Sequence, residues 1–162
     1  MVAPARSAVG KNGQMAAEHA IEHANVAAEP QRCLAVATDF ERYPDWARDI
    51  KEAHILERDE AGRGTKVAYR AAAMGRSASY VLAYTYVGEQ QISWRLEQGD
   101  IMKALDGSYV FAAGASGTTD ITYELSVELV VPIPGFVKRR AETKIMGTAL
   151  RELKHRVESL TV

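Results

Sequence analysis

The stretch from residue 118 to residue 160 constrains the fold more than any other part of the chain, because a half-buried strand there leads directly into a long amphipathic helix. Along residues 121–129 apolar side chains alternate with Thr, Glu and Ser, which predicts a strand with one face on a core and one face in water. The strand ends at residues 131–136, where two prolines remove backbone donors and a glycine allows the chain to turn.

The helix that follows has one apolar face. Its apolar residues recur every four positions at Val137, Ala141, Ile145, Ala149, Leu153 and Val157, and Met146, Leu150 and Leu160 widen the stripe. Pro134 suits a first helical turn, so the helix is predicted over residues 134–160. At about 1.5 Å per residue it would be roughly 40 Å long, more than a small sheet can cover closely. A rod of this length across a curved sheet can leave a hollow beneath it.

Length and composition are those of one ordinary globular domain. The chain has 162 residues, of which 47% are hydrophobic and 25% charged, and this is enough for a real core. A net charge of -1 argues against a nucleic-acid surface over the whole molecule, and no apolar run approaches the ~20 residues needed to span a bilayer. The single Cys33 cannot form an internal disulfide and residues 1–30 lack a signal-peptide pattern, so we expect a cytoplasmic protein.

Residues 1–14 are small and polar and show no periodicity, so they are predicted to form a flexible N-terminal lead. No repeat or linker divides the remainder, and residues 15–162 are expected to form a single domain.

Six strands are predicted in the middle of the chain, each followed by a turn signal. They cover residues 52–58, 64–73, 77–87, 91–98, 101–111 and 118–131. The connections between them are short and rich in Gly, Asp and Ser, so sequential strands should pair antiparallel.

The amino-terminal part gives a mixed signal. Residues 15–39 are rich in Ala, Glu and Gln, so propensity alone favours one helix, but Pro30 suits a helix start and not a helix interior. We expect a strand at residues 19–27, a short helix at 30–38 and a helical turn near 43–47.

Four segments carry a resemblance to a known family. The segments VAAEP (26–30) and VATDFERYPDW (36–46) resemble the opening of the polyketide cyclase/dehydrase family. That family belongs to the START-related (SRPBCC) superfamily, which includes birch pollen allergen and the coenzyme Q-binding proteins. The segments LDGSY (105–109) and VPIPGF (131–136) look like its actinobacterial branch, and the agreement covers residues 18–160.

The resemblance implies an α+β helix-grip fold, in which a strongly bent antiparallel sheet wraps around the carboxy-terminal helix and two short helices close one end. It also implies a cavity between sheet and helix that takes an apolar or aromatic small molecule, lipid-like or polyketide-like. Nothing in the motifs specifies a ligand or a reaction.

Aromatic residues gather on single faces of neighbouring predicted strands and offer apolar walls with polar tips. Packing between sheet and helix explains the same pattern, because alternation fixes the face and does not distinguish core from pocket. The amino-terminal half of the long helix is expected to border the hollow, and Leu153 and Val157 to be core. The candidate ligand-binding residues are Tyr80, Tyr84, Trp94, Tyr109, Phe136, Ala141, Ile145 and Thr148.

The acid, arginine and aromatics of residues 39–46 are interpreted as structural. Asp39 can cap the next turn, Pro44 can fix it and Trp46 can anchor the corner, while Phe40 is expected to be buried.

Basic residues near the start of the long helix oppose the helix dipole, at a cost of about 0.3–1 kcal/mol each at low salt. They are Lys138, Arg139 and Arg140, with Lys144 beyond. This placement suggests a transient contact with an anion, such as a lipid headgroup or a carboxylate. A solvated face is the commoner explanation of such residues, and both remain open.

Metal, cofactor and nucleophile signals are poor. His19 and His23 would lie about 13 Å apart on a strand, too far to share one ion, and no third ligand is near in sequence. Cys33 is expected to be a small buried residue, and His54 and His155 surface residues. We find no phosphate loop, dinucleotide glycine pattern or nucleophile elbow, so no metal and no cofactor is predicted and no catalytic residue can be assigned.

Two classes of function remain. The first is a binding or carrier protein that removes a hydrophobic molecule from water, with a few Tyr or Trp donors setting its orientation. The second is a polyketide aromatase/cyclase-dehydratase that folds a poly-β-ketone and assists its closure by acid-base chemistry. We favour binding, because no inward carboxylate or histidine can be placed. A weaker third reading is a protein contact surface formed by the basic helix start and Phe136.

Overall fold

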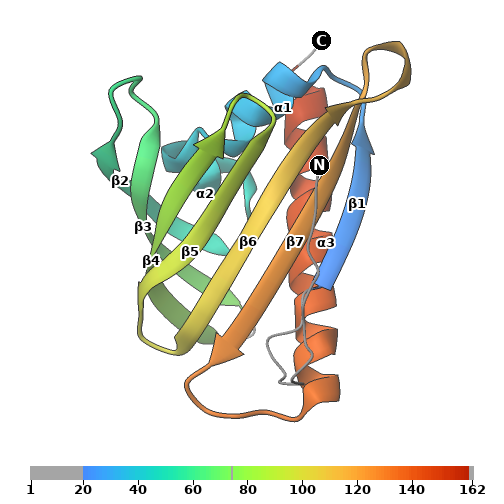
Figure 1. The fold of residues 1–162 in the computed structure, drawn as a ribbon. Coiled ribbons are helices and arrows are strands. Elements are labelled where there is room, and N and C mark those ends of the chain that lie inside the picture. The colour runs from blue at the N-terminus through green and yellow to red at the C-terminus, as the bar shows by residue number, and fades with distance from the viewer. Residues whose placement is uncertain (1–19, 74, 161–162) are drawn as a thin grey trace, which may run out of the picture.

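The computed structural model describes residues 20–73 and 75–160, which form a curled antiparallel sheet with one long helix along its face (Figure 1). The seven strands lie in the order β1-β7-β6-β5-β4-β3-β2. Their bounds are β1 (Ala20–Val26), β2 (Ile50–Arg58), β3 (Gly64–Ala73), β4 (Arg76–Val87), β5 (Gln91–Gly99), β6 (Met102–Ala113) and β7 (Thr119–Leu129). The helices are α1 (Pro30–Ala37), α2 (Tyr43–Trp46) and α3 (Gly135–Ser159), with short 3-10 turns η1 (Phe40–Arg42) and η2 (Ala115–Gly117).

This architecture confirms the predicted helix-grip fold. The strand boundaries agree with the predicted ones to within about two residues, as expected when hydrophobic alternation and turn signals coincide. Residues 1–14, predicted to be a flexible lead, and His19 lie outside the described residues. No helix of the described residues is long and apolar enough to cross a membrane.

The first strand pairs with the last one. β1 pairs antiparallel with β7, from Ala20 opposite Leu125 to Val26 opposite Thr119. Local propensity in this segment favours helix, so it is this pairing that supports the strand. Val26, at its end, is fully buried.

The carboxy-terminal half of α3 is fixed to the amino-terminal elements. Leu153 and Val157 are each 1% exposed, which confirms their assignment to the core. Lys154 Nζ donates to the Asn25 carbonyl at 2.7 Å, and the Ala27 N–H donates to Glu158 at 2.9 Å. The first turns of α3 lie at the opposite end of the molecule, beside the chain that leads in from β7 (Figure 1).

The corner between α1 and β2 differs from the prediction in one detail. Phe40 is fully buried, as expected, but Asp39 makes no side-chain cap. The reason is that η1 is a single 3-10 turn closed by the backbone, in which the Arg42 N–H donates to the Asp39 carbonyl at 3.1 Å. The carboxylate of Glu41 instead accepts the Ile55 N–H at 2.9 Å and attaches the corner to β2.

Candidate functional site

A cavity of about 290 Å³ lies between the sheet and α3. Strands β2 to β7 contribute to its wall, and α2, the α2–β2 connection and the middle of α3 complete it. Its aromatic lining consists of Tyr43, Tyr69, Tyr80, Tyr84, Tyr109 and Tyr123 together with Trp46 and Trp94.

Strand alternation and register bring these rings together. Tyr84 lies opposite Trp94 in the β4–β5 pair, and Tyr109 lies opposite Tyr123 in the β6–β7 pair. Because opposite residues in antiparallel strands point to the same face, the pairs form one aromatic wall. The ring centroids of Trp94 and Tyr109 are 5.3 Å apart, which joins the two pairs.

Gly107 makes room for one of these rings. It lies opposite Trp94 in the β5–β6 pair, and a Cβ at this position would meet the indole at 2.7 Å and the Glu124 carbonyl oxygen at 2.5 Å. Atoms cannot approach so closely, so only glycine lets Trp94 lie flat over the neighbouring strand.

The tyrosine hydroxyls make the polar part of the lining. The Tyr69 and Tyr84 hydroxyls hydrogen-bond each other at 2.6 Å, and Tyr43 donates to the Ala37 carbonyl. No group in the described chain hydrogen-bonds the Tyr80 hydroxyl. Burial raises the pKa of Tyr80 well above its ordinary value. Burial likewise raises the pKa of Tyr109, so these hydroxyls are neutral at physiological pH and can act as donors.

The structure places six of the eight candidate residues on the cavity wall, and their contact with a ligand stays a prediction. They are Tyr80, Tyr84, Trp94, Tyr109, Ile145 and Thr148. Phe136 and Ala141 do not line the cavity. Phe136 is 63% exposed, because the first turn of α3 lies beyond the aromatic wall.

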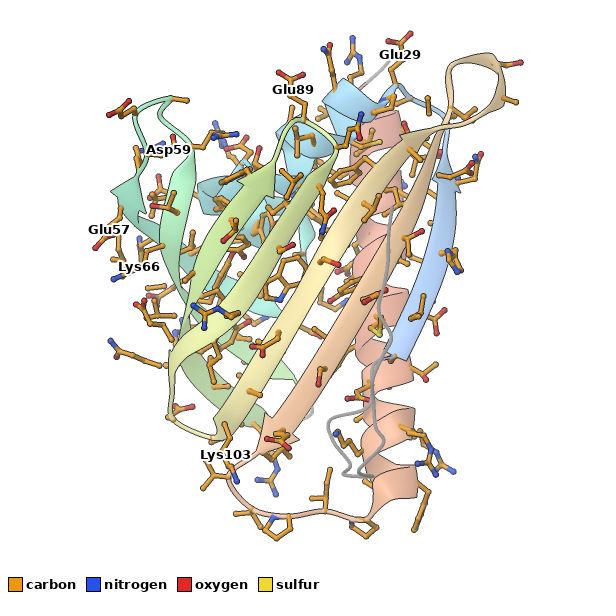
Figure 2. All side chains as sticks on the ribbon, in the orientation of Figure 1. Glu29, Glu57, Asp59, Lys66, Glu89 and Lys103 are labelled. Atoms are coloured by element: carbon orange, nitrogen blue, oxygen red, sulfur yellow. The ribbon has the colours of Figure 1, made fainter. Side chains whose placement is uncertain are left out.

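Ala141 lines a different hollow of about 340 Å³, between the start of α3 and residues 127–133. Lys103 contributes to its edge, and Figure 2 shows this side chain at the lower end of the sheet, near the chain that enters α3. Glu142, 3% exposed, lies at this hollow and accepts the Val127 N–H at 3.3 Å. The carboxylate therefore satisfies a backbone donor of β7 beyond the last pair that β1 makes.

Sequence reasoning missed several cavity residues. Tyr123 was predicted to be on a dry strand face, and Trp46 was predicted to be a structural anchor, but neither was assigned to the cavity. The helix residue Ala149 was also missed, although it lines the cavity two turns beyond Ala141. The alternation of β3 and β7 could have identified Tyr69 and Tyr123, because both face the same way as Tyr84.

Other reactive side chains lie away from the cavity. Cys33 is fully buried, as expected, and burial raises the pKa of its thiol, which disfavours the nucleophilic thiolate. His54 and His155 are exposed, as predicted. His23 on β1 lies 3.3 Å from the Thr122 hydroxyl, and the described residues contain no cluster of three or more His, Cys, Asp or Glu that could hold a metal.

On one side the cavity is bounded by α3 and the α2–β2 connection, where it adjoins a second, more exposed hollow, and we call this side its mouth. Asp49 and Glu152 line it, together with Trp46 and Thr148. Arg48 holds Glu152 through both its backbone N–H, at 3.2 Å, and its Nε, at 3.3 Å. This double contact links the connection to the helix across the opening.

Comparisons with known proteins agree with the fold and identify the family. Residues 26–154 match the family described as polyketide cyclase / dehydrase and lipid transport. The match covers most of the chain, so this protein belongs to that family, as the resemblance implied. The comparison with curated protein sequences gave no match.

Solved structures share the architecture. A START superfamily protein from Mycobacterium smegmatis is 27% identical, with a TM-score of 0.84 over 88% of this chain and 99% of that chain. A protein from Thermus thermophilus is 21% identical, with a TM-score of 0.75 over 90% of this chain and 100% of that chain. The Zhui aromatase/cyclase from a Streptomyces species is 15% identical, with a TM-score of 0.75 over 87% and 93% of the two chains. The last two likenesses concern the fold alone.

Proposed function

We propose that this protein binds a hydrophobic or aromatic small molecule in the cavity between the sheet and α3. The observation that carries the proposal is a preformed cavity of about 290 Å³ whose lining is mostly aromatic. Ligand sites in proteins are typically concave and apolar, with a few placed polar groups. The hydroxyl of Tyr80, which has no hydrogen-bond partner among the described residues, is one such group, because a ligand acceptor could take its hydrogen bond.

The volume sets the scale of the ligand. An apolar cavity of ~150 Å³ accommodates benzene, so a cavity of about twice that size suits an aromatic body of two to three rings or an alkyl chain of similar bulk. Removing roughly 250 Å² of apolar ligand surface from water would contribute about 6 kcal/mol before the costs of association. Micromolar to millimolar affinity is the realistic expectation.

The alternative of a polyketide aromatase/cyclase has less support. Acid-base catalysis needs a group whose proton moves near neutral pH, and the pKa values of the cavity tyrosines are all raised above 10. The carboxylates at the mouth are Asp49 and Glu152, and Arg48 already engages Glu152. Binding without catalysis therefore fits the lining better.

Two finer proposals accompany this one. The start of α3 would contact anionic headgroups through Lys138, Arg139 and Arg140, because the exposed apolar side chains Val131 and Phe136 lie close by in sequence and could enter the interface. A cytoplasmic location is proposed from the composition, in which the single cysteine can form no internal disulfide.

A matched pair of helix variants tests the cavity. Ala149 lines the cavity and Ala141 lines the outer hollow, so Ala149→Trp should fill the site while Ala141→Trp leaves it open. We expect Ala149→Trp to weaken binding of the neutral fluorescent probe N-phenyl-1-naphthylamine at least about tenfold, and Ala141→Trp to bind as the parent does.

Circular dichroism should report folded protein for both variants. If Ala149→Trp does not fold, Ile145→Trp replaces it, because Ile145 lines the same cavity and is 46% exposed. Unchanged probe binding in a folded cavity variant, or absence of probe binding to the parent protein, would refute the proposal. Independently of these variants, native mass spectrometry of the purified parent protein, followed by extraction, would identify any co-purified ligand.

A further inference from the structure

A further hollow, of about 480 Å³, lies outside the mouth of the cavity. It is formed by α2, the α2–β2 connection and the carboxy-terminal half of α3, and we term it the vestibule. Trp46, Thr148 and Glu152 line both the vestibule and the cavity. The two hollows therefore adjoin each other at these side chains.

The vestibule carries an excess of positive charge. Arg48, Arg151 and Arg156 line it from two elements. Arg48 pairs with Glu152 at 3.3 Å, and the acidic Asp45 of the vestibule pairs with Arg42 at 3.1 Å.

Two guanidinium groups are left over once these pairs are made. Arg151 makes its one side-chain contact with the Thr148 hydroxyl, at 3.3 Å, and Arg156 makes no side-chain hydrogen bond or ion pair within the described residues. Neither arginine is thus neutralised by a carboxylate of the described chain.

We propose that the ligand is an amphiphile with an acidic head, whose apolar body fills the cavity while its carboxylate or phosphate lies in the vestibule against Arg151 and Arg156. This inference rests on the proposed binding function and names the chemical class of the ligand. The planar guanidinium matches carboxylate and phosphate oxygens in a two-pronged geometry, which an ammonium group cannot do.

The charges at the mouth also fix the orientation of such a ligand. Asp49 lies on the cavity side, and its negative charge disfavours an acidic head further inside. Glu152 is the other carboxylate at the mouth, and its pairing with Arg48 offsets its repulsion of an anion. The acidic head must therefore stay on the outer side of Trp46, where the unpaired arginines are.

The experiment compares three competitors that share one tail. The affinities of decanol, decanoate and decyl phosphate are measured by their displacement of N-phenyl-1-naphthylamine from the full chain. The assay is run at about pH 7.5, first in about 20 mM and then in about 500 mM NaCl. We expect at least one of the two acids to bind about fivefold to tenfold more tightly than decanol at low salt, with the advantage shrinking at high salt. The acid with the larger advantage identifies the head.

Variants assign this advantage to the vestibule. The double variant Arg151→Gln with Arg156→Gln should lose the tighter binding of the acid relative to decanol and should bind decanol as the parent does. The matched control is Arg32→Gln with Arg95→Gln, which makes the same change in net charge at exposed positions that line neither hollow. The control should retain the full advantage.

The outcomes separate this inference from the proposed function. Equal affinity of all three competitors would overturn the acidic head and leave the cavity function standing. Equal loss of the advantage in the control pair would also overturn it, because the effect would then be one of net charge. Failure of the parent chain to bind the probe or any competitor would instead refute the binding function.

Discussion

The hydrogen bond between the Tyr69 and Tyr84 hydroxyls offers a sensitive test of the cavity wall. The two oxygens are 2.6 Å apart, and the residues are 5% and 9% exposed. Changing either tyrosine to phenylalanine keeps the ring and removes one partner, so the other hydroxyl loses its hydrogen bond. Changing both removes the polar pair and leaves no orphan.

Each single change should therefore lower the free energy of unfolding by more than the double change does. An unsatisfied buried hydroxyl costs about 1–3 kcal/mol. Both residues line the cavity, where water can take over part of the lost bond, so we expect each single change to cost about 1–1.5 kcal/mol. The double change should cost ~0.5 kcal/mol, well below the sum of the singles. Tyr80→Phe is the matched control and should cost little, because its hydroxyl has no hydrogen-bond partner in the described chain.

Urea unfolding followed by tryptophan fluorescence measures these free energies, provided that the dependence on urea stays the same across the variants. Additive losses in the double variant would mean that the hydroxyls are not coupled. A loss in Tyr80→Phe as large as in the single variants would mean that the cost comes from the ring environment. Either result would refute this account of the wall.

Three further perturbations probe other parts of the molecule. Gly107→Ala should destabilise the fold by about 2–3 kcal/mol and change the near-ultraviolet circular dichroism, because the new methyl group meets Trp94 and the Glu124 carbonyl; an unchanged melting temperature would contradict the observed packing. Burial raises the pKa of Tyr86 from 10.0 to about 12, so the contribution of Tyr86 to stability should be level below pH 10 and fall above it. Tyrosinate absorbance that appears at high pH without loss of stability would contradict this. Phe136→Asp should weaken sedimentation of the protein with anionic vesicles and leave its melting temperature unchanged. Full retention of vesicle binding would mean that the start of α3 does not contact the membrane.

The sequence predicted the strands and α3 well, because both depend on periodicities that a single chain displays. The segment of β1 had the least local support among the strands. Its composition favours helix, and the strand expected at residues 19–27 depends on the pairing of Ala20 with Leu125, which joins residues far apart in sequence. Contacts of that kind leave no local pattern to detect.

The cavity was predicted in part. Alternation placed Tyr80, Tyr84 and Trp94 on the correct face, because a strand has only two faces. The helix residues were harder, since a period of four identifies the apolar face but not the point at which the helix crosses the aromatic wall. The crossing lies near Ala149, whereas Ala141, two turns earlier, lines the outer hollow.

Ring contacts explain how a hollow can persist beside a packed core. Starting from the buried Phe40, centroid distances of 4.5 Å to Tyr84, 6.0 Å on to Trp94, 5.3 Å to Tyr109 and 4.6 Å to Tyr123 form one continuous chain of aromatic contacts. Each ring is supported by its neighbours on the sheet and needs no ligand to hold it, and aromatic pairs contribute about 0.5–1.5 kcal/mol beyond area burial. Because the wall is ordered in advance, little binding free energy is lost in ordering it, so even a modest apolar contact area can give measurable affinity.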